Sequence, residues 1–463
     1  MAPRVLSAIM FYPRGGSSHA ARALARGLTE RGYSVTLLAG SRSDLGPHSD
    51  ARAFYGSIDV RPVKFDAALR GDDPMRYDEG PGDAPMHPSF EDRPGAPDRV
   101  FAALDDLDYE RQVRAWSREL QRAGAADADV IHLHHLTPLN EAADRVAPGV
   151  PLVGQLHGTE LLMLEQIRDG APPTWTHADQ WAGRMRAWAR CCTRLVVSPA
   201  GVQRAAALLE MPAERFVALP GGVDTDLFAP RAVDRDRFWL QALVTDSNAA
   251  LPGGPPGSLR YDAAEVASLA AGVVLLYVGR FTAVKRLDRL IGAFAEAQAA
   301  LERRVGLVLV GGHPGEWEGE HPAELAARLG VRGVFLAGWR AHEELPEFFC
   351  ASDALVTASR HEQFGQVLVE AMACSLPALA VRSLGPASIV DSGRTGWLVE
   401  PDDDAAYSAA LREVIEDREE RLRRGRAAHR AVCERFSWAV ASNQLAAVLE
   451  EVLAGTQRAP VPA

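Results

Sequence analysis

A chain of 463 residues, 47% hydrophobic and 24% charged, has the composition of a globular protein and enough length for about two or three domains. Its net charge of −11, with no dominant basic stripe, argues against a nucleic-acid-binding protein. The five cysteines are scattered without a CxxC pair, and no apolar run approaches the ~18 residues of a bilayer span, so we expect a cytoplasmic protein.

The first half of the chain alternates strands and helices. A strand at 4–11, a glycine turn at Gly15-Gly16, a helix at 20–31 and a strand at 34–39 form a βαβ unit, which is typical of a parallel sheet. Residues 70–100 are rich in Pro, Gly and Asp and are predicted to form a surface insertion. We therefore expect a Rossmann-like domain over 1–219, with further strands at 130–133, 152–156, 195–197 and 216–219.

The second half repeats this alternation after a break at Pro220-Gly221-Gly222. We expect a hinge and a flexible connector over 220–271, because Pro and Gly crowd residues 251–257. Apolar residues at helical spacing predict an amphipathic closing helix and tail over 436–463. A second domain is expected over 272–435, with strands at 273–278, 305–310, 333–337, 354–358 and 378–381. Two doubly wound α/β domains in sequence predict a central ligand cleft that faces the carboxyl ends of both sheets.

The segment from Glu362 to Glu370 carries the strongest functional signal. It follows a predicted strand, turns tightly at Phe364-Gly365 and runs into a predicted helix at 367–373. The N-terminus of such a helix leaves backbone N–H groups and a positive dipole end for a phosphate. The two carboxylates can accept hydrogen bonds from two sets of hydroxyls on one ligand. The segment therefore predicts a site for a nucleotide sugar.

Arg280 and Lys285 come just after the predicted strand 273–278, where the next helix begins. Two cations at such a turn can converge on one diphosphate and stabilise it as a leaving group. Lys285 and Lys64 are the only lysines among 50 basic residues, and a lysine in such a chain suggests a need for its compact ammonium. The alternative is a solvated basic turn.

Two glycine turns follow predicted strands. Gly15-Gly16 could let the backbone approach a phosphate or an acceptor, or could form a simple tight connection. It lacks both the GxGxxG pattern and a following ribose-binding acid, which counts against a dehydrogenase. The turn at 311–315 is expected to shape the floor of the nucleotide pocket.

Histidines gather at the ends of strands in the first half. His157 is expected in the cleft, where a neutral ring could bind a sugar hydroxyl; the alternative is a cap on a buried strand. His134 and His135 are candidates for the acceptor side. No cysteine or acidic partner is spaced to complete a site with the HxHH run at 132–135, so no metal is expected.

Two other clusters have structural explanations. The acidic run at 402–404 follows Pro401 and is expected to cap a helix rather than to bind a metal. The segment 181–194 mixes tryptophans and arginines and could lie on an anionic membrane. A surface helix with its tryptophans packed inward is the favoured interpretation.

These motifs together resemble the family 4 glycosyltransferases, a retaining group with the two-domain GT-B fold. The resemblance extends over nearly the whole chain and is strongest in the Glu362–Glu370 spacing combined with Arg280 and Lys285. It also rests on Gly15-Gly16, His157-Gly158, the hinge at 220–230 and the segments 391–401 and 436–438. The fold implies that the closing helix packs back toward the first domain, which would hold the acceptor while the second holds the donor.

The resemblance implies a role for each candidate residue. Arg280 and Lys285 would hold the donor diphosphate, Glu370 would bind the ribose hydroxyls, and Glu362 would contact the donor sugar near its 3-hydroxyl. His157 would face that sugar. Other contacts to the sugar and phosphates would come from the backbone at Gly16, Phe364, Gly365 and Gln366. The family uses no metal or other cofactor, and in its front-face reaction the departing phosphate oxygen takes the acceptor proton, so no dedicated general base is implied.

The expected partners are a nucleotide sugar and a small-molecule, glycan or lipid acceptor. The hinge has glycine where the family usually has asparagine, and the 70–100 insertion lies in the half that selects the acceptor, so the resemblance carries least weight there. Two alternatives stay open: a sugar-nucleotide epimerase on the same scaffold, which would need no acceptor, and a non-catalytic nucleotide-sugar sensor.

Overall fold

The chain folds into two compact units. The computed structural model describes residues 2–77, 80–92, 96–312, 317–362 and 364–456. The first unit comprises Met1–Gly221 together with Trp438–Ala463, and the second comprises Gly222–Ser437. Each unit is built around its own parallel sheet and is described by itself.

The first unit contains a seven-stranded parallel sheet with the strand order β3-β2-β1-β4-β5-β6-β7. Its strands are rich in Val, Leu and Ile and are largely buried, as expected for a parallel sheet covered on both faces. They are β1 (Arg4–Ile9), β2 (Ser34–Ser41), β3 (Asp59–Lys64), β4 (Val130–His134), β5 (Leu152–Gln155), β6 (Arg194–Val197) and β7 (Phe216–Ala218). The helices are α1 (Gly16–Glu30), α2 (Ala51–Tyr55), α3 (Asp106–Arg122), α4 (Pro138–Val146), α5 (Thr159–Gly170), α6 (Ala178–Cys191), α7 (Val202–Leu209) and α17 (Trp438–Thr456).

The 70–100 segment is more than the surface loop that its composition predicted. Met75, Met86, Phe90 and Val100 are each at most 8% exposed and belong to the main core of the first unit. The Gln112 side chain of α3 donates a hydrogen bond to the Met86 carbonyl at 2.7 Å, which satisfies a buried backbone acceptor. Widely spaced apolar residues, rather than a periodic pattern, therefore tie this insertion to the fold.

The second unit contains a six-stranded parallel sheet with the strand order β10-β9-β8-β11-β12-β13. The strands are β8 (Val273–Gly279), β9 (Val305–Gly311), β10 (Val334–Gly338), β11 (Ala354–Val356), β12 (Ala378–Val381) and β13 (Gly396–Val399). The helices are α8 (Arg235–Leu240), α9 (Ala263–Ala270), α10 (Leu287–Ala300), α11 (Pro322–Arg328), α12 (Leu345–Cys350), α13 (Gln366–Ala373), α14 (Leu384–Ile389), α15 (Asp404–Glu416) and α16 (Arg418–Arg435). Both units thus have the doubly wound α/β architecture that the sequence predicted.

The range 220–271, expected to be a hinge and flexible connector, is mostly folded into the second unit. It contributes α8 and α9, and Trp239, Leu243 and Val266 are completely buried in a core of that unit. The Trp239 indole N–H donates to the Ala351 carbonyl at 3.3 Å. The Pro- and Gly-rich part at 251–257 is only a surface excursion within this folded segment.

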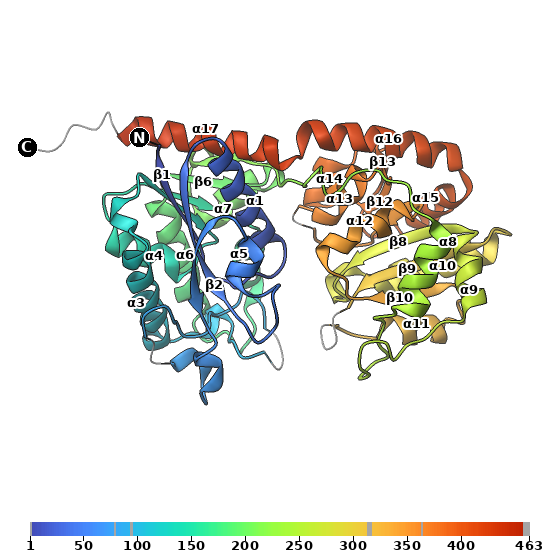
Figure 1. Cartoon of the computed structure of the whole chain (residues 1–463), viewed down its shortest axis with the longest axis horizontal. Coiled ribbons are helices and arrows are strands. Elements are labelled where there is room, and N and C mark those ends of the chain that lie inside the picture. Colours follow the sequence, from blue (N-terminus) through green and yellow to red (C-terminus); the bar gives the residue numbers. More distant parts are fainter. Residues whose placement is uncertain (1, 78–79, 93–95, 313–316, 363, 457–463) are drawn as a thin grey trace, which may run out of the picture. The chain divides into compact units, whose positions relative to one another are not determined.

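The closing helix α17 belongs to the first unit, as predicted. Leu445 and Leu449 are fully buried in a cluster with Val130, Val153 and Val196 of the central strands. Figure 1 shows α17 lying beside α1, and Arg31 at the end of α1 donates hydrogen bonds to the Ala439 carbonyl at 3.0 Å and to Asn443 at 2.6 Å. The helix therefore completes one face of the first sheet.

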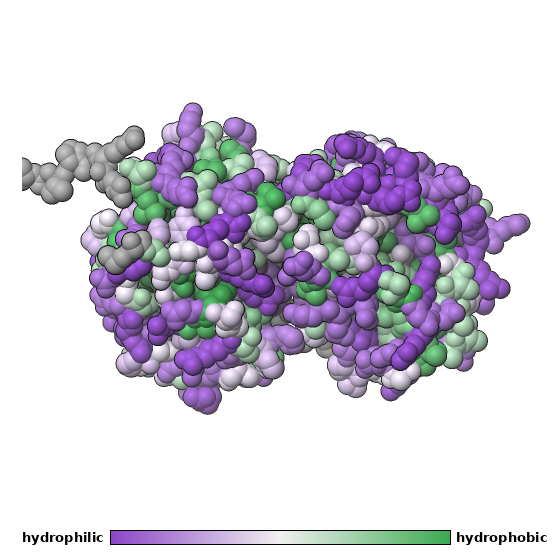
Figure 2. All heavy atoms as spheres, turned by 45° about the horizontal axis from the view of Figure 1, so that its top comes forward, coloured by the Kyte–Doolittle hydropathy of each residue, from purple (hydrophilic) through white to green (hydrophobic). Residues whose placement is uncertain are grey.

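In each sheet the direction of strand addition reverses at one point, between β1 and β4 in the first unit and between β8 and β11 in the second. The crevice beyond the carboxyl ends of the strands at such a point is where open α/β sheets bind ligands. In the face shown in Figure 2, hydrophobic residues are interspersed among hydrophilic ones. Among the residues described, no helix is both long and apolar enough to cross a membrane.

Candidate functional site

Lys285 and Glu362 meet at the reversal point of the second sheet. Lys285 ends a short 3-10 turn after β8, and Glu362 follows β11, the neighbouring strand. The Lys285 ammonium lies 2.5 Å from Glu362 Oε2, and the two side chains are 20% and 22% exposed. The structure thus brings together two residues that the sequence placed 77 positions apart, and each neutralises the other's charge before any ligand binds.

Arg280 directly follows β8 and is exposed to solvent. The Tyr277 hydroxyl fixes the backbone of Arg280, because it donates a hydrogen bond to the Arg280 carbonyl at 2.7 Å. Burial, followed by the negative charge of Glu362, raises the pKa of Tyr277. The hydroxyl therefore stays protonated and keeps donating to the turn that carries Arg280.

The turn before α13 has the geometry of an anion site. Gly365 caps the helix with a φ of 95°, a conformation that glycine adopts without strain, and no side chain caps the helix at this residue. The Gly385 N–H of α14 donates to the Glu362 carbonyl at 2.9 Å. A Cβ at Gly385 would lie 2.0 Å from the Phe364 carbonyl oxygen, so only glycine permits this close support of the loop. Residue 363 of this segment lies outside the described residues.

Glu370 lies one helical turn into α13 and is 3% exposed. Its Oε1 atom receives two contacts, from His342 Nε2 at 2.8 Å and from the Gln366 side chain at 3.1 Å. Gln366 also donates to the Gly222 carbonyl at 2.9 Å. His342 was missed in the sequence, since it precedes α12 in an ordinary polar turn with no spacing that links it to Glu370. With Oε1 occupied in this way, Oε2 is the oxygen best placed to accept from a ligand hydroxyl.

The glycine turn after β9 packs against the Arg280 turn. A Cβ at Gly311 would lie 2.0 Å from the Gly279 carbonyl oxygen, and a Cβ at Gly312 would lie 2.2 Å from the Phe281 ring. These glycines allow close packing of neighbouring turns beside the site. The rest of the predicted turn, 313–315, lies outside the described residues.

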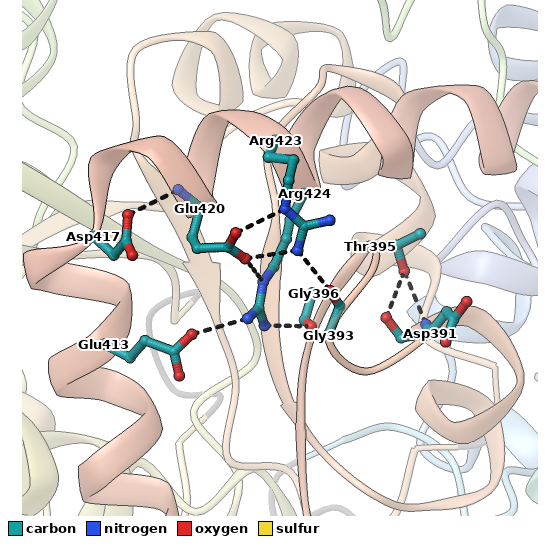
Figure 3. A network of polar contacts seen from close by, with 9 residues as sticks. All are labelled: Asp391, Gly393, Thr395, Gly396, Glu413, Asp417, Glu420, Arg423 and Arg424. Carbon is teal, nitrogen blue, oxygen red and sulfur yellow. Dashed lines mark hydrogen bonds and ion pairs between the residues drawn. The ribbon is translucent and has the colours of Figure 1, made fainter.

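The segment 391–401, which contributed to the family resemblance, accepts backbone hydrogen bonds from two arginines of α16 (Figure 3). Arg423 donates to the Gly393 carbonyl at 2.7 Å, and Arg424 donates to the Gly396 carbonyl at 3.0 Å. Both arginines also pair with Glu420. The segment follows α14, whose Gly385 N–H donates to the Glu362 carbonyl, and the two arginines hold its backbone against α16.

In the first unit, the loop before α1 carries the predicted glycines. Gly15 has a φ of 71° and caps α1, which begins at Gly16 and has no side-chain cap at its start. A Cβ at either glycine would meet no atom within 4 Å, so the space over this helix N-terminus is open. Uncapped N–H groups at the positive end of a 15-residue helix suit an anionic ligand.

His157 follows β5 at the reversal region of the first sheet and is partly exposed. His134 and His135, predicted on the acceptor side, lie behind it and are 0% and 4% exposed. His134 Nδ1 is 3.0 Å from His157 Nε2, and His135 Nδ1 is 2.7 Å from Glu160 Oε1. Their burial makes them interior partners of His157 rather than surface residues. Glu160 was missed in the sequence because it sits inside a helix pattern.

Burial lowers the pKa of His157 to about 3, with a further lowering from His135, so this ring is neutral at pH 7. Burial also lowers the pKa of His134 well below its ordinary value. Burial by itself would raise the pKa of Glu160, but the charge and hydrogen bond of His135 bring it down to about 2. A neutral His157 ring can make a hydrogen bond to a sugar hydroxyl, as proposed from the sequence.

The other sequence clusters have the structural roles that were favoured. The Asp403 carboxylate accepts from the Ala406 N–H and caps α15. Trp181 and Trp188 of α6 are 0% and 4% exposed, which places both indoles inward. Within the described ranges, no group of three or more His, Cys, Asp or Glu side chains is arranged to hold a metal ion.

Two known protein families match the two halves of the chain. The family described as "Glycosyltransferase Family 4" matches residues 14–227, and that described as "Glycosyl transferases group 1" matches residues 267–431. The chain is 33% identical over 347 residues to D-inositol 3-phosphate glycosyltransferase 1 of Catenulispora acidiphila, a match that covers 72% of this chain and 75% of the relative. It is 28% identical to D-inositol 3-phosphate glycosyltransferase of a Nocardioides species over 68% of this chain and 67% of that protein.

Solved structures share the fold at low identity. Sucrose-phosphate synthase from Thermosynechococcus elongatus matches with a TM-score of 0.68 and 18% identity, covering 98% of this chain and 100% of that one. Anabaena Alr3699/HepE in complex with UDP and glucose matches with a TM-score of 0.67 and 19% identity, covering 96% and 99%. The two family matches and the 33% identical relative agree with the two doubly wound units. This chain is a glycosyltransferase that belongs to glycosyltransferase family 4.

Proposed function

We propose that this protein is a retaining, metal-independent glycosyltransferase that transfers a sugar from a nucleoside-diphosphate sugar to an acceptor hydroxyl. The observation that carries the proposal is the pairing of Lys285 with Glu362 beside the uncapped start of α13. A cation, a carboxylate and free helix N–H groups at one strand edge match a diphosphate joined to a sugar. The complex of the structural neighbour HepE with UDP and glucose supports this donor class.

In the second unit, each donor group would meet a chemically matched side chain. Arg280 and Lys285 bind the diphosphate, and their charge stabilises it as it departs. Glu370 accepts a ribose hydroxyl through Oε2, and Glu362 contacts the sugar near its 3-hydroxyl. The backbone N–H groups around Gly365 complete the phosphate contacts. Two cations and a helix N-terminus supply the countercharge that a metal ion would otherwise provide.

In the first unit, His157 contacts the donor sugar and Gly16 lets the α1 N-terminus approach the diphosphate. The acceptor oxygen forms a bond to the anomeric carbon on the face from which the phosphate leaves. The bond from that carbon to the phosphate oxygen breaks, and the departing phosphate oxygen takes the proton of the acceptor hydroxyl. The anomeric configuration is therefore retained without a dedicated general base.

For the acceptor, we propose a small polyol that carries a phosphate. Seven relatives, among them the 33% identical one, are named D-inositol 3-phosphate glycosyltransferases. Another relative, 26% identical, is named alpha-D-kanosaminyltransferase. We also propose the cytoplasm as the compartment, in keeping with the scattered cysteines.

The test is to incubate the protein with a panel of nucleotide sugars, with and without inositol phosphates, and to follow release of the nucleoside diphosphate. We expect release that depends on the acceptor, an unchanged rate in EDTA and a product with the anomeric configuration of the donor. An isomerised nucleotide sugar without release would favour an epimerase instead. Lys285→Met should abolish most turnover. Lys64→Met, which changes the other lysine, an exposed residue of the edge strand β3, is the matched control.

A further inference from the structure

A cluster of buried titratable residues lies behind His157 and has no role in the reaction described above. It comprises His132, His134, His135 and Glu160, each at most 4% exposed. The His157 ring lies 5.2 Å from the His134 ring and 4.4 Å from the His135 ring, measured between centroids. Three imidazoles and a carboxylate in one interior site are costly to bury, because each polar atom there needs a partner.

A chain of contacts runs from Ser7 on β1 through His134 on β4 to His157. Ser7 Oγ is 3.4 Å from His134 Nε2, and His134 Nδ1 is 3.0 Å from His157 Nε2. His157 Nδ1 has no hydrogen-bond partner among the residues that the structure describes, yet it is not a buried atom, so it is open to a ligand. This series of contacts thus ends at His157, which is more exposed than His132, His134 and His135.

The direction of hydrogen-bond donation along this series of contacts follows from counting donors and acceptors. Ser7 is 1% exposed, and its hydroxyl has no other side-chain or backbone acceptor among the described residues. If His134 Nε2 carried the proton, the Ser7 hydroxyl hydrogen would be buried without an acceptor, which is unfavourable. The favoured arrangement therefore has Ser7 donating to a bare His134 Nε2. His134 Nδ1–H then donates to His157 Nε2, which leaves the proton of His157 on Nδ1.

A second set of contacts fixes the backbone around the ring. His135 has a φ of 67°, a strained conformation for a residue with a side chain, and its Nδ1 lies 2.7 Å from Glu160 Oε1, a charge contact without hydrogen-bond geometry. Glu160 also accepts from the His157 backbone N–H at 3.2 Å. Between these two residues, Gly158 turns with a φ of 95° at the start of α5. The carboxylate of Glu160 therefore links the turn after β4 to the turn after β5.

We propose that His134 is a positioning residue that sets the tautomer of His157, so that His157 presents an Nδ1–H donor to an oxygen of the donor sugar. Ser7 fixes the direction of this chain, and the His135–Glu160 pair holds the two turns in register. This inference rests on the proposed contact between His157 and the sugar. It goes beyond that contact by stating which ring atom carries the proton and which buried residues place it there.

The first experiment reads the tautomer directly and needs no activity. Selective ¹⁵N labelling of histidine, with long-range ¹H–¹⁵N correlation, distinguishes a protonated Nδ1 from a protonated Nε2, and His157→Phe assigns the signal. We expect His157 to be protonated on Nδ1 in the unmodified protein. We expect this preference to weaken in Ser7→Ala, where the chain can reverse. A His157 protonated on Nε2 in the unmodified protein would overturn the proposal.

The second experiment uses matched variants in the transfer assay. His134→Leu removes the donor to His157 and should lower kcat about 10- to 100-fold with a smaller change in donor KM. His134→Asn, whose amide can donate in place of Nδ1–H, should lose less than about threefold. His132→Leu removes another buried imidazole from the same strand, whose hydrogen bond goes to Gln155 rather than to His157. Because the His132 ring lies 4.6 Å from the His134 ring, this variant is the control for packing of the cluster.

Equal losses of kcat in His134→Leu and His132→Leu would show that only packing matters, and would overturn the proposal. Equal losses in His134→Leu and His134→Asn would do the same. If no donor and acceptor support transfer, the proposed function fails, but the tautomer measurement still decides whether the hydrogen-bond chain exists.

Discussion

The contact between Lys285 and Glu362 predicts that a change of charge at Glu362 has opposite effects on binding and on turnover. The two side chains are 20% and 22% exposed and 2.5 Å apart, so each partly neutralises the other before the donor arrives. An ion pair at this depth is worth about 1 kcal/mol, at the upper end of the range for exposed pairs. A diphosphate must compete with Glu362 for the Lys285 ammonium, so its binding free energy is less favourable by about 1 kcal/mol.

Glu362→Gln should therefore bind a nucleoside diphosphate without sugar about fivefold more tightly, the equivalent of about 1 kcal/mol. The same change should lower kcat for sugar transfer about 10- to 100-fold, because it removes a charged hydrogen bond of about 1.5–3 kcal/mol to the sugar. Isothermal titration calorimetry with the diphosphate of the best donor measures the first effect, and steady-state kinetics measures the second.

A double-mutant cycle isolates the cause. Lys285→Met should weaken diphosphate binding, and Glu362→Gln added to Lys285→Met should produce no further tightening, since there is no cation left to release. If Glu362→Gln tightens binding equally in both backgrounds, the gain comes from the general loss of negative charge. If Glu362→Gln weakens diphosphate binding, the Lys285–Glu362 pair is not the competitor that the geometry implies.

Three other predictions concern the donor pocket, acid stability and the closing helix. His342→Leu removes a contact to the buried Glu370 and should weaken nucleoside-diphosphate binding about 10-fold. His342→Gln keeps a hydrogen-bond donor and should bind the diphosphate more tightly than the Leu variant. Equal affinities of the two variants would show that the hydrogen bond to Glu370 does not contribute to binding. Burial lowers the pKa of His132 to about 4, below its unfolded value, so its stabilising effect is complete above about pH 6.5 and fades as the pH falls toward 4. The contribution of His132 to the opening free energy that hydrogen exchange measures in β4 should therefore be about 2 kcal/mol smaller at pH 5 than at pH 7.5. If His132→Gln showed the same pH dependence as the unmodified protein, this prediction would be contradicted. Leu445→Ala opens a cavity under α17 and should cost about 2–5 kcal/mol, seen as faster exchange in the first unit; a change confined to the second unit would be contrary to the fold.

The regular part of the fold was predictable because buried parallel strands are continuous apolar runs. β4, β9 and β12 lie within a residue or so of their predicted positions for this reason. β3 and β13 were missed. β3 alternates charged residues and contains Pro62 on the edge of its sheet. β13 lies inside the segment 391–401, which was interpreted only as part of the family resemblance.

The segment from Glu362 to Glu370 was predictable as a candidate site from local chemistry, and the residues that contact it were not. Glu362, Gly365 and Glu370 stand in one short segment, so their spacing along a strand, a turn and a helix could be interpreted directly. His342 and Glu160 act through contacts across the fold, and no spacing in the sequence links them to Glu370 or His135. His134 and His135 were predicted on the acceptor side because they stand at the end of a strand. The structure buries both beneath His157, and their sequence positions did not indicate this burial.

The position of α17 has a consequence for biosynthesis. Strands β4, β5 and β6 pack their Val130, Val153 and Val196 side chains against α17, which is translated only after the whole second unit. On the ribosome, the first unit must therefore wait with part of one sheet face uncovered while the second unit emerges and can fold. A nascent chain paused before Leu445 would expose that apolar face and become a substrate for chaperones.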